Sequence, residues 1–182
     1  MTTFNTPGLP SALFLDFEAS SLSPESWPIE IGLTRVDDNG HLHTASKLIR
    51  PHKSWDIEDW SQASAEVHNI PFNVLMNTGE DAEDVARWAL GQTQNHLILS
   101  DAPGFEKRWY NKLLETVGQY KLQIHHIDSY FASTLENPGL SVAYEHLERT
   151  AVPHRAGPDS AIMAKAWVKG RKADAGEIPV RP

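Results

Sequence analysis

Two carboxylates near the start of the chain have the spacing of metal ligands. Asp16 and Glu18 close a short apolar run at residues 11–17, which is typical of a buried β-strand. Side chains two residues apart in a strand point to the same face, so we expect both carboxylates to project together and Phe17 to enter the core. Two adjacent acids repel each other unless a cation lies between them. The pair therefore predicts a cation site, with a strand that ends in solvent as the alternative.

A second cluster lies near the C-terminus, in the segment HRAGPDSA at residues 154–161. Pro158 suits the first turn of a helix, because the N–H that proline lacks would have no helical partner there. Asp159 is then expected at the N-terminal end of that helix, with His154 on the preceding loop. An Asp and a His placed in this way can act as metal ligand and general base. The alternative is an acid that only complements the helix dipole, beside an inert loop histidine.

A third acidic segment, SDAPGFE at residues 100–106, joins an apolar run to a helical pattern. Either Asp101 or Glu106 could face a site there, because both lie close to the point where a strand would end. The alternative is that Asp101 caps the helix and Glu106 lies on the surface.

The rest of the pattern indicates the elements that must position these acids. Apolar and alternating runs predict strands at residues 11–17, 29–36, 41–50, 96–99 and 122–127. Helical spacing predicts helices at residues 58–68, 81–90, 105–118, 140–150 and 158–171. Early strands followed by alternating helices and strands indicate an α/β or α+β sheet covered by helices. We expect a single domain over residues 1–182, with a core at about residues 11–172 and short flexible ends.

Composition limits the class of protein. Of the 182 residues, 40% are apolar and 22% are charged, as in a soluble globular protein. The absence of cysteine excludes disulfides and thiolate-ligated zinc. No apolar run approaches the ~20 residues that span a bilayer, and the N-terminal segment does not resemble a secretory signal, so we expect a cytoplasmic protein without membrane contact. The net charge of −8 argues against broad electrostatic binding of nucleic acid, although metal ions can neutralise an acidic site.

The first and the C-terminal clusters together resemble motifs of the DEDDh 3′→5′ exonucleases, a family that includes proofreading subunits, oligoribonuclease and ribonuclease T. LFLDFEASSL is similar to the motif in which D-x-E closes the first strand. HRAGPDSA is similar to the motif in which a His precedes an Asp by five positions. The resemblance covers about residues 12–170 and implies a ribonuclease-H-like α/β fold, with a mixed five-stranded sheet flanked by helices.

The resemblance also implies a two-metal hydrolysis of phosphodiester bonds at the 3′ end of single-stranded nucleic acid, RNA or DNA. Asp16, Glu18 and Asp159 would hold two divalent cations, Mg²⁺ or Mn²⁺, which prefer hard oxygen ligands. His154 would accept the proton of the attacking water, since its ordinary pKa of ~6.5 lies near neutral pH. Many relatives form dimers, so a homodimer is a further expectation.

The second motif of the family is altered in this chain. The family has an Asn and, a few residues later, an aromatic residue followed by the catalytic Asp, whereas this chain has Asp101, Phe105 and Glu106 at those positions. Alignment favours Glu106 as the catalytic carboxylate, although its side chain is one methylene longer. Asp101, at the strand tip, is the alternative. The change also leaves open a weakened exonuclease-fold module that binds nucleic acid or a protein partner without turnover.

Residues that bind substrate are implied directly after the first motif. Ser20, Ser21 and Leu22 would grip the terminal nucleotide, with Leu22 wedged against its base. His68, in the segment EVHNIP, resembles a family segment near the entering strand, but we interpret it as structural. Arg155 is expected to meet backbone phosphates. A solvated helix face or the same phosphate contact explains three further basic residues, Lys107, Arg108 and Lys112.

Overall fold

The computed structural model describes residue 4, residues 10–120 and residues 122–178. The flexible ends that the sequence predicts fall mainly on residues 1–3, 5–9 and 179–182, which lie outside this described part of the chain. The last helix extends to Asp174, slightly beyond the predicted core.

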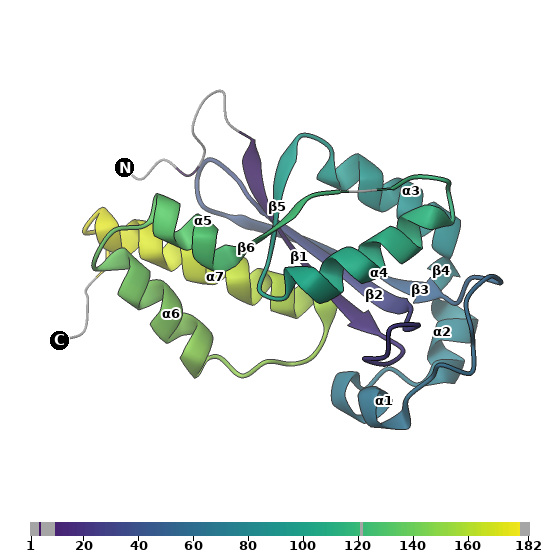
Figure 1. The fold of residues 1–182 in the computed structure, drawn as a ribbon. Coiled ribbons are helices and arrows are strands. Elements are labelled where there is room, and N and C mark those ends of the chain that lie inside the picture. Colours follow the sequence, from purple (N-terminus) through teal and green to yellow (C-terminus); the bar gives the residue numbers. More distant parts are fainter. Residues whose placement is uncertain (1–3, 5–9, 121, 179–182) are drawn as a thin grey trace.

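A mixed six-stranded sheet forms the centre of the molecule, in the order β4-β3-β2-β1-β5-β6 (Figure 1). Its strands are β1 (Ser11–Ala19), β2 (Pro28–Val36), β3 (Leu42–Arg50), β4 (Glu80–Asp81), β5 (His96–Ser100) and β6 (Ile124–His126). β1, β2 and β3 are antiparallel to one another, whereas β5 is parallel to β1 and β6 is parallel to β5. The mixed α/β architecture is confirmed, but the predicted count of five strands is too low. β4 has only two residues, which is too short to leave an alternating pattern.

Seven helices occur in the described part of the chain, and they lie around the sheet. They are α1 (Gln62–His68), α2 (Phe72–Thr78), α3 (Ala82–Thr93), α4 (Pro103–Glu115), α5 (Ile127–Thr134), α6 (Gly139–Arg149) and α7 (Ala156–Asp174). The sequence did not predict α2 or α5, because seven or eight residues contain too few turns to establish a helical period. None of the helices in the described residues is both long and apolar enough to cross a membrane.

The alternation of side chains along β1 divides the core into two layers. Leu13, Leu15 and Phe17 belong to a cluster with apolar residues of α3 and α4 on one face of the sheet. Ala12 and Phe14 belong to a second cluster with α5, α6 and α7 on the other face. Phe17 is buried and its ring centroid lies 5.7 Å from that of Tyr110, which confirms its predicted place in the core.

Two features of the packing leave the C-terminal half of β1 available for a site. β1 pairs with β5 only from Ser11 to Phe14, so the residues that follow have no β5 partner, and α4 packs against β1 on one face of the sheet. On the α7 face, Gly32 of β2 permits very close approach, since a Cβ there would lie 2.0 Å from the carbonyl of Ala156. The first turn of α7 can therefore lie directly on the β1–β2 pair, next to Asp16 and Glu18.

Candidate active site

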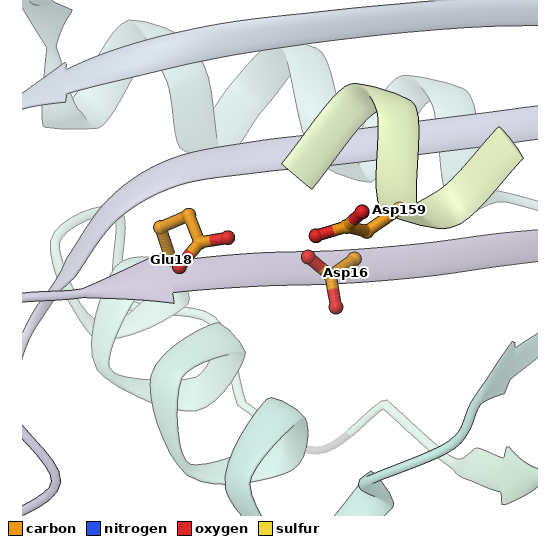
Figure 2. A group of neighbouring side chains, drawn as sticks. All are labelled: Asp16, Glu18 and Asp159. Carbon is orange, nitrogen blue, oxygen red and sulfur yellow. The ribbon is translucent and has the colours of Figure 1, made fainter. Parts of the chain in front are cut away.

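Three carboxylates from distant parts of the chain converge at the C-terminal end of β1. Asp16 and Glu18 project from β1 and Asp159 from the first turn of α7, as Figure 2 shows. One oxygen from each carboxylate lies within 4.8 Å of the others. The period-two geometry of the strand and the helix start at residues 156–159 explain why these side chains meet.

The two carboxylate oxygens of Asp159 have different surroundings. Its Oδ2 accepts a hydrogen bond of 3.1 Å from the backbone N–H of Arg155, which secures the start of α7. Its Oδ1 is buried and has no hydrogen-bond partner among the described residues. A buried carboxylate oxygen without a donor is destabilising unless a cation approaches it. The free oxygen therefore suits a metal ligand.

Burial and mutual repulsion make the charged forms of these acids unfavourable. Burial raises the pKa of Glu18 to about 8, with further contributions from Asp159 and Glu30 and a partial offset by Arg155. Burial and then the charges of Glu18 and Asp159 raise the pKa of Asp16 well above its ordinary value. A divalent cation would remove this repulsion, and the all-oxygen donor set suits Mg²⁺ or Mn²⁺. The three acids therefore fit a divalent metal site.

Glu106 reaches the same acids from the opposite face of β1. Glu106 lies in the first turn of α4 and is only 2% exposed. The alternative prediction, that Glu106 lies on the surface, is therefore wrong. Burial, then Asp16, Asp101 and Glu18, raise its pKa well above the ordinary value, while a hydrogen bond from the backbone of Phe17 opposes that shift. Its Oε2 is buried without a hydrogen-bond partner in the described structure.

Asp101 occupies a different position, at the exposed rim of the site. It follows β5 directly and lines the cavity that contains Asp16, Glu18 and Asp159. The predicted alternative, a helix cap at Asp101, is also wrong, because the N-cap of α4 is Ala102. Both residues of the altered motif thus lie near the acidic cluster, Glu106 buried beneath it and Asp101 open to solvent.

His154 shares this cavity, whose volume is about 360 Å³. Its side chain is exposed. Burial raises the pKa of the neighbouring Asp159, and the hydrogen bond from the backbone of Arg155 and the proximity of His154 lower it in part. The backbone of His154 has φ of +53°, in the left-handed region that residues with a Cβ adopt at some cost. The surrounding loop must therefore hold it. The rest of the cavity wall is largely apolar and includes Ile127, Leu147, Val152, Ile162 and Met163.

A second cavity, of about 200 Å³, adjoins the first and shares Phe17, Glu18 and His154 with it. The other residues in its wall are Ala19, Ser21, Leu22, Ser64, Val67, His68 and Trp109. Leu22 belongs to the wall of this cavity and is 72% exposed, so its side chain is available to a ligand.

His68 is a cavity residue that the sequence interpretation set aside as structural. It is buried, and its Nδ1 accepts a hydrogen bond from the backbone N–H of Ile70. Its Nε2 is buried and has no partner among the described residues. Burial lowers the pKa of His68 to about 4, so the ring is neutral near pH 7 and carries its proton on Nε2. The resemblance of the segment EVHNIP to a family segment could have identified His68 as a site residue. No sequence pattern indicates that Trp109 lies in the same cavity wall.

Other residues predicted to bind substrate hold the surrounding loops. The hydroxyl of Ser20 is buried and accepts the backbone N–H of Trp27, and the hydroxyl of Ser21 donates to Asp59. Arg155 donates from Nε and Nη2 to the carboxylate of Glu30, at 2.8 Å each. The backbone N–H of Ala156 donates to the same carboxylate at 3.0 Å. This pairing ties the His154 loop to β2.

Comparisons with known proteins give a match at the level of structure. The sequence matches no protein-family model and no curated protein. The structure is similar to Escherichia coli exonuclease I in complex with a dT13 oligonucleotide, with a TM-score of 0.66 and 15% identity over 92% of this chain and 43% of that one. For the same enzyme in complex with a dA16 oligonucleotide, the TM-score is 0.68 and the identity 14%, over 92% and 41% of the two chains.

A full-length 3′-exonuclease gives a TM-score of 0.64 and 13% identity, over 92% of this chain and 83% of that one. Of E. coli exonuclease I, by contrast, the chain spans less than half of the length. At these identities the likeness concerns the fold, and it shows that this chain has the ribonuclease-H-like fold of these exonucleases, as the sequence predicts.

Proposed function

We propose that the chain is a metal-dependent 3′→5′ exonuclease that hydrolyses single-stranded RNA or DNA. The observation that carries the proposal is the convergence of Asp16, Glu18 and Asp159 in one cavity with His154. The fold is that of E. coli exonuclease I, which was solved in complex with single-stranded oligonucleotides. An acidic cluster with an adjacent histidine, on this fold, supports phosphodiester hydrolysis better than any other chemistry of these residues.

Asp16, Glu18 and Asp159 would hold two divalent cations, Mg²⁺ or Mn²⁺. Bound cations would neutralise charge on the phosphoryl group and lower the pKa of the attacking water. Glu106 is the favoured fourth carboxylate, because it is buried next to Asp16 and has one free oxygen. Asp101 would then assist from the rim of the cavity.

The chain's own residues would orient the substrate and move the proton. His154 would accept a proton from the attacking water, since the exposed ring lies in both cavities. The second cavity would hold the 3′-terminal nucleotide, with Leu22 and Trp109 against its apolar surfaces. The Nε2–H of His68 would donate to an oxygen or nitrogen of that nucleotide, which would satisfy its buried donor.

The second candidate function is a binding module with little or no turnover. Glu106 favours it, because a longer side chain replaces the aspartate of the family motif. Both functions predict binding of single-stranded nucleic acid in the presence of metal. Only the exonuclease predicts cleavage.

The test is the shortening of 5′-labelled and 3′-labelled single-stranded RNA and DNA with Mn²⁺ or Mg²⁺. We expect release of single nucleotides from the 3′ end, which ceases with EDTA and in the Asp16→Asn variant. A folded protein that binds the oligonucleotides with metal, yet cleaves neither RNA nor DNA, would replace the exonuclease proposal with the binding module.

A further inference from the structure

Helix α4 carries a group of aromatic and cationic residues, of which the catalytic proposal uses only Trp109. We name the residues Phe105, Arg108, Trp109 and Lys112 the α4 ridge. The guanidinium carbon of Arg108 lies 5.1 Å from the ring centroid of Phe105 and 5.6 Å from that of Trp109. The centroids of the two rings are 5.5 Å apart. Positions 105, 108, 109 and 112 follow the three- and four-residue spacing of one helix face.

The α4 ridge begins at the candidate active site and leads away from it. Phe105 precedes Glu106, whose carboxylate lies beneath the acidic cluster. Trp109, one turn further along, forms part of the wall of the second cavity. In Figure 1, α4 extends from the region beside β1 toward α3. From Phe105 to Lys112 the helix rises about 10 Å, so the ridge can contact a strand beyond the terminal nucleotide.

Neutral partners hold the two cations of the ridge in place. Nη2 of Arg108 donates to the hydroxyl of Ser26 at 3.3 Å, and Nε1 of Trp109 donates to the same hydroxyl at 2.8 Å. Nζ of Lys112 donates to the backbone carbonyl of Glu25. Among the ion pairs of the described residues, none joins Arg108 or Lys112 to a carboxylate. Their positive charges are therefore available to an anion.

The chemistry of the ridge matches an unpaired nucleic-acid strand. Proteins that bind single strands without sequence preference combine cations for the phosphates with aromatic rings for the bases. Phe105 is 42% exposed, so its ring can stack on a base, while Arg108 and Lys112 can contact phosphates. A chain with a net charge of −8 needs such a local cationic surface to approach a polyanion.

We infer that the α4 ridge binds the part of a single-stranded substrate that lies 5′ of the terminal nucleotide. This inference rests on the proposed function, since it assumes that the 3′ end occupies the two cavities. Phe105 would stack on a base, and Arg108 and Lys112 would contact successive phosphates. Selectivity for longer strands is the functional consequence.

The competing path is the face formed by α6 and α7. Lys169 contacts His146 at 3.1 Å there, and Lys165 lies close enough to lower the pKa of that histidine further, after burial and Lys169. This face offers cations, but in the described structure the large apolar side chains that are strongly exposed include no aromatic residue from α6 or α7. The ridge has both components, which favours it as the path of the strand.

The test compares two charge-matched double variants, Arg108→Gln with Lys112→Gln and Lys165→Gln with Lys169→Gln. Substrates are labelled oligonucleotides of two and ten nucleotides, and KM and kcat are measured at several salt concentrations. We expect the first pair to raise KM for the ten-nucleotide strand about tenfold with a change in kcat below twofold, and to raise KM for the dinucleotide less than twofold. For this double variant, the slope of log KM against the logarithm of the salt concentration should also decrease by about 1 to 2. A decrease of this size is expected for the loss of two phosphate contacts.

A Phe105→Leu variant removes stacking while it keeps an apolar side chain, so it should raise KM for the longer strand alone without loss of fold. Equal effects on both lengths, or no effect of the Arg108 and Lys112 changes, would overturn the inference. A KM increase confined to the Lys165 and Lys169 variant would place the strand on the α6–α7 face instead.

Binding to the Asp16→Asn protein, measured by fluorescence anisotropy with the ten-nucleotide strand and Mn²⁺, separates the inference from the proposed function. If the protein never cleaves, but the ridge substitutions weaken this binding about tenfold, the ridge is supported and the exonuclease proposal fails. If cleavage occurs and the ridge substitutions leave binding unchanged, the proposed function is supported and the ridge is overturned.

Discussion

Glu18 and Glu30 are direct partners in the β1–β2 pair, yet their carboxylates have opposite surroundings. The buried carboxylate of Glu30 accepts two hydrogen bonds from Arg155 and one from the backbone N–H of Ala156. The carboxylate of Glu18 faces Asp16 and Asp159 instead, and burial raises its pKa to about 8. The same residue type, at paired positions in one sheet, thus has hydrogen-bond and charge partners in Glu30 and meets electrostatic repulsion in Glu18.

The difference indicates how the fold separates stability from function. The Glu30–Arg155 pair joins β2 to the loop that contains His154, whose backbone is in the left-handed region. Among the described residues, no ion pair joins Asp16, Glu18 or Asp159 to a cationic side chain, and a divalent cation is the natural group to complete them. One satisfied charge pair, Glu30 with Arg155, thus lies next to a group of acids without such a partner. Neutralising an acid of the cluster should therefore raise the stability of the metal-free protein, whereas breaking the Glu30–Arg155 pair should lower it.

The largest effect is expected from neutralising the acidic cluster. We predict that Asp16→Asn lowers kcat for a labelled oligonucleotide more than about 100-fold, because loss of a proposed metal ligand should exceed the 10–100-fold cost of losing a group that only orients a ligand. Circular dichroism should show an unchanged fold, and metal-free protein at pH 8 should melt at a higher temperature than wild type. Activity above half of the wild-type value would contradict the role of Asp16.

Breaking the satisfied pair should affect stability first. Arg155→Met would leave Glu30 as a buried charge without its partner, which typically costs about 3–5 kcal/mol. Glu30→Gln should cost less, because Arg155 is 41% exposed and its guanidinium can turn toward water. Urea unfolding of both variants and wild type would measure this order. Equal losses in the free energy of unfolding would contradict the idea that the buried Glu30 depends on its partner more than the half-exposed Arg155 does.

The altered second motif offers a finer comparison between a buried acid and an exposed one. Glu106→Gln should reduce kcat about 10–100-fold, because the carboxylate lies buried beside Asp16 and would orient the proposed metal ligands. Asp101→Asn should have a smaller effect, since its side chain is solvated at the rim of the cavity. Single-turnover cleavage of one labelled oligonucleotide gives both values. The reverse order would assign the catalytic role to Asp101.

The smallest effect concerns the pH dependence of stability without metal. Folding raises the pKa of Glu18 from 4.5 to about 8, so the folded protein binds its proton more tightly than the unfolded chain does. Its stabilising contribution is therefore complete below pH 4.5 and is lost as the pH rises toward 8. His68, whose pKa falls from 6.5 to about 4, has the opposite effect only below pH 6.5.

In EDTA, the melting temperature should thus fall by a few degrees between pH 6.5 and 8. Glu18→Gln should flatten this slope, and Mn²⁺ should restore the melting temperature of the wild type at pH 8. A slope that is the same in wild type and Glu18→Gln would contradict the assigned pKa of Glu18.

The sequence correctly predicted much of the fold, and it singled out the acids that the structure brings together. Long strands and helices have enough repeats for their period to be read, whereas β4, α2 and α5 are too short. Asp16 and Glu18 share a face because of the strand period, and Asp159 lies in the first turn of α7 because the helix starts just before Pro158. These features depend on local geometry alone, which the order of residues encodes directly.

Only the tertiary structure decided how the site is completed. Glu106 is buried because the first turn of α4 packs against β1, beyond the point where β1 stops pairing with β5. Arg155 binds Glu30 across 125 positions of the chain, and His68 and Trp109 meet in one cavity from different elements. No local period contains this information, because such contacts depend on how the two faces of the sheet are packed, and that packing is a property of the whole chain.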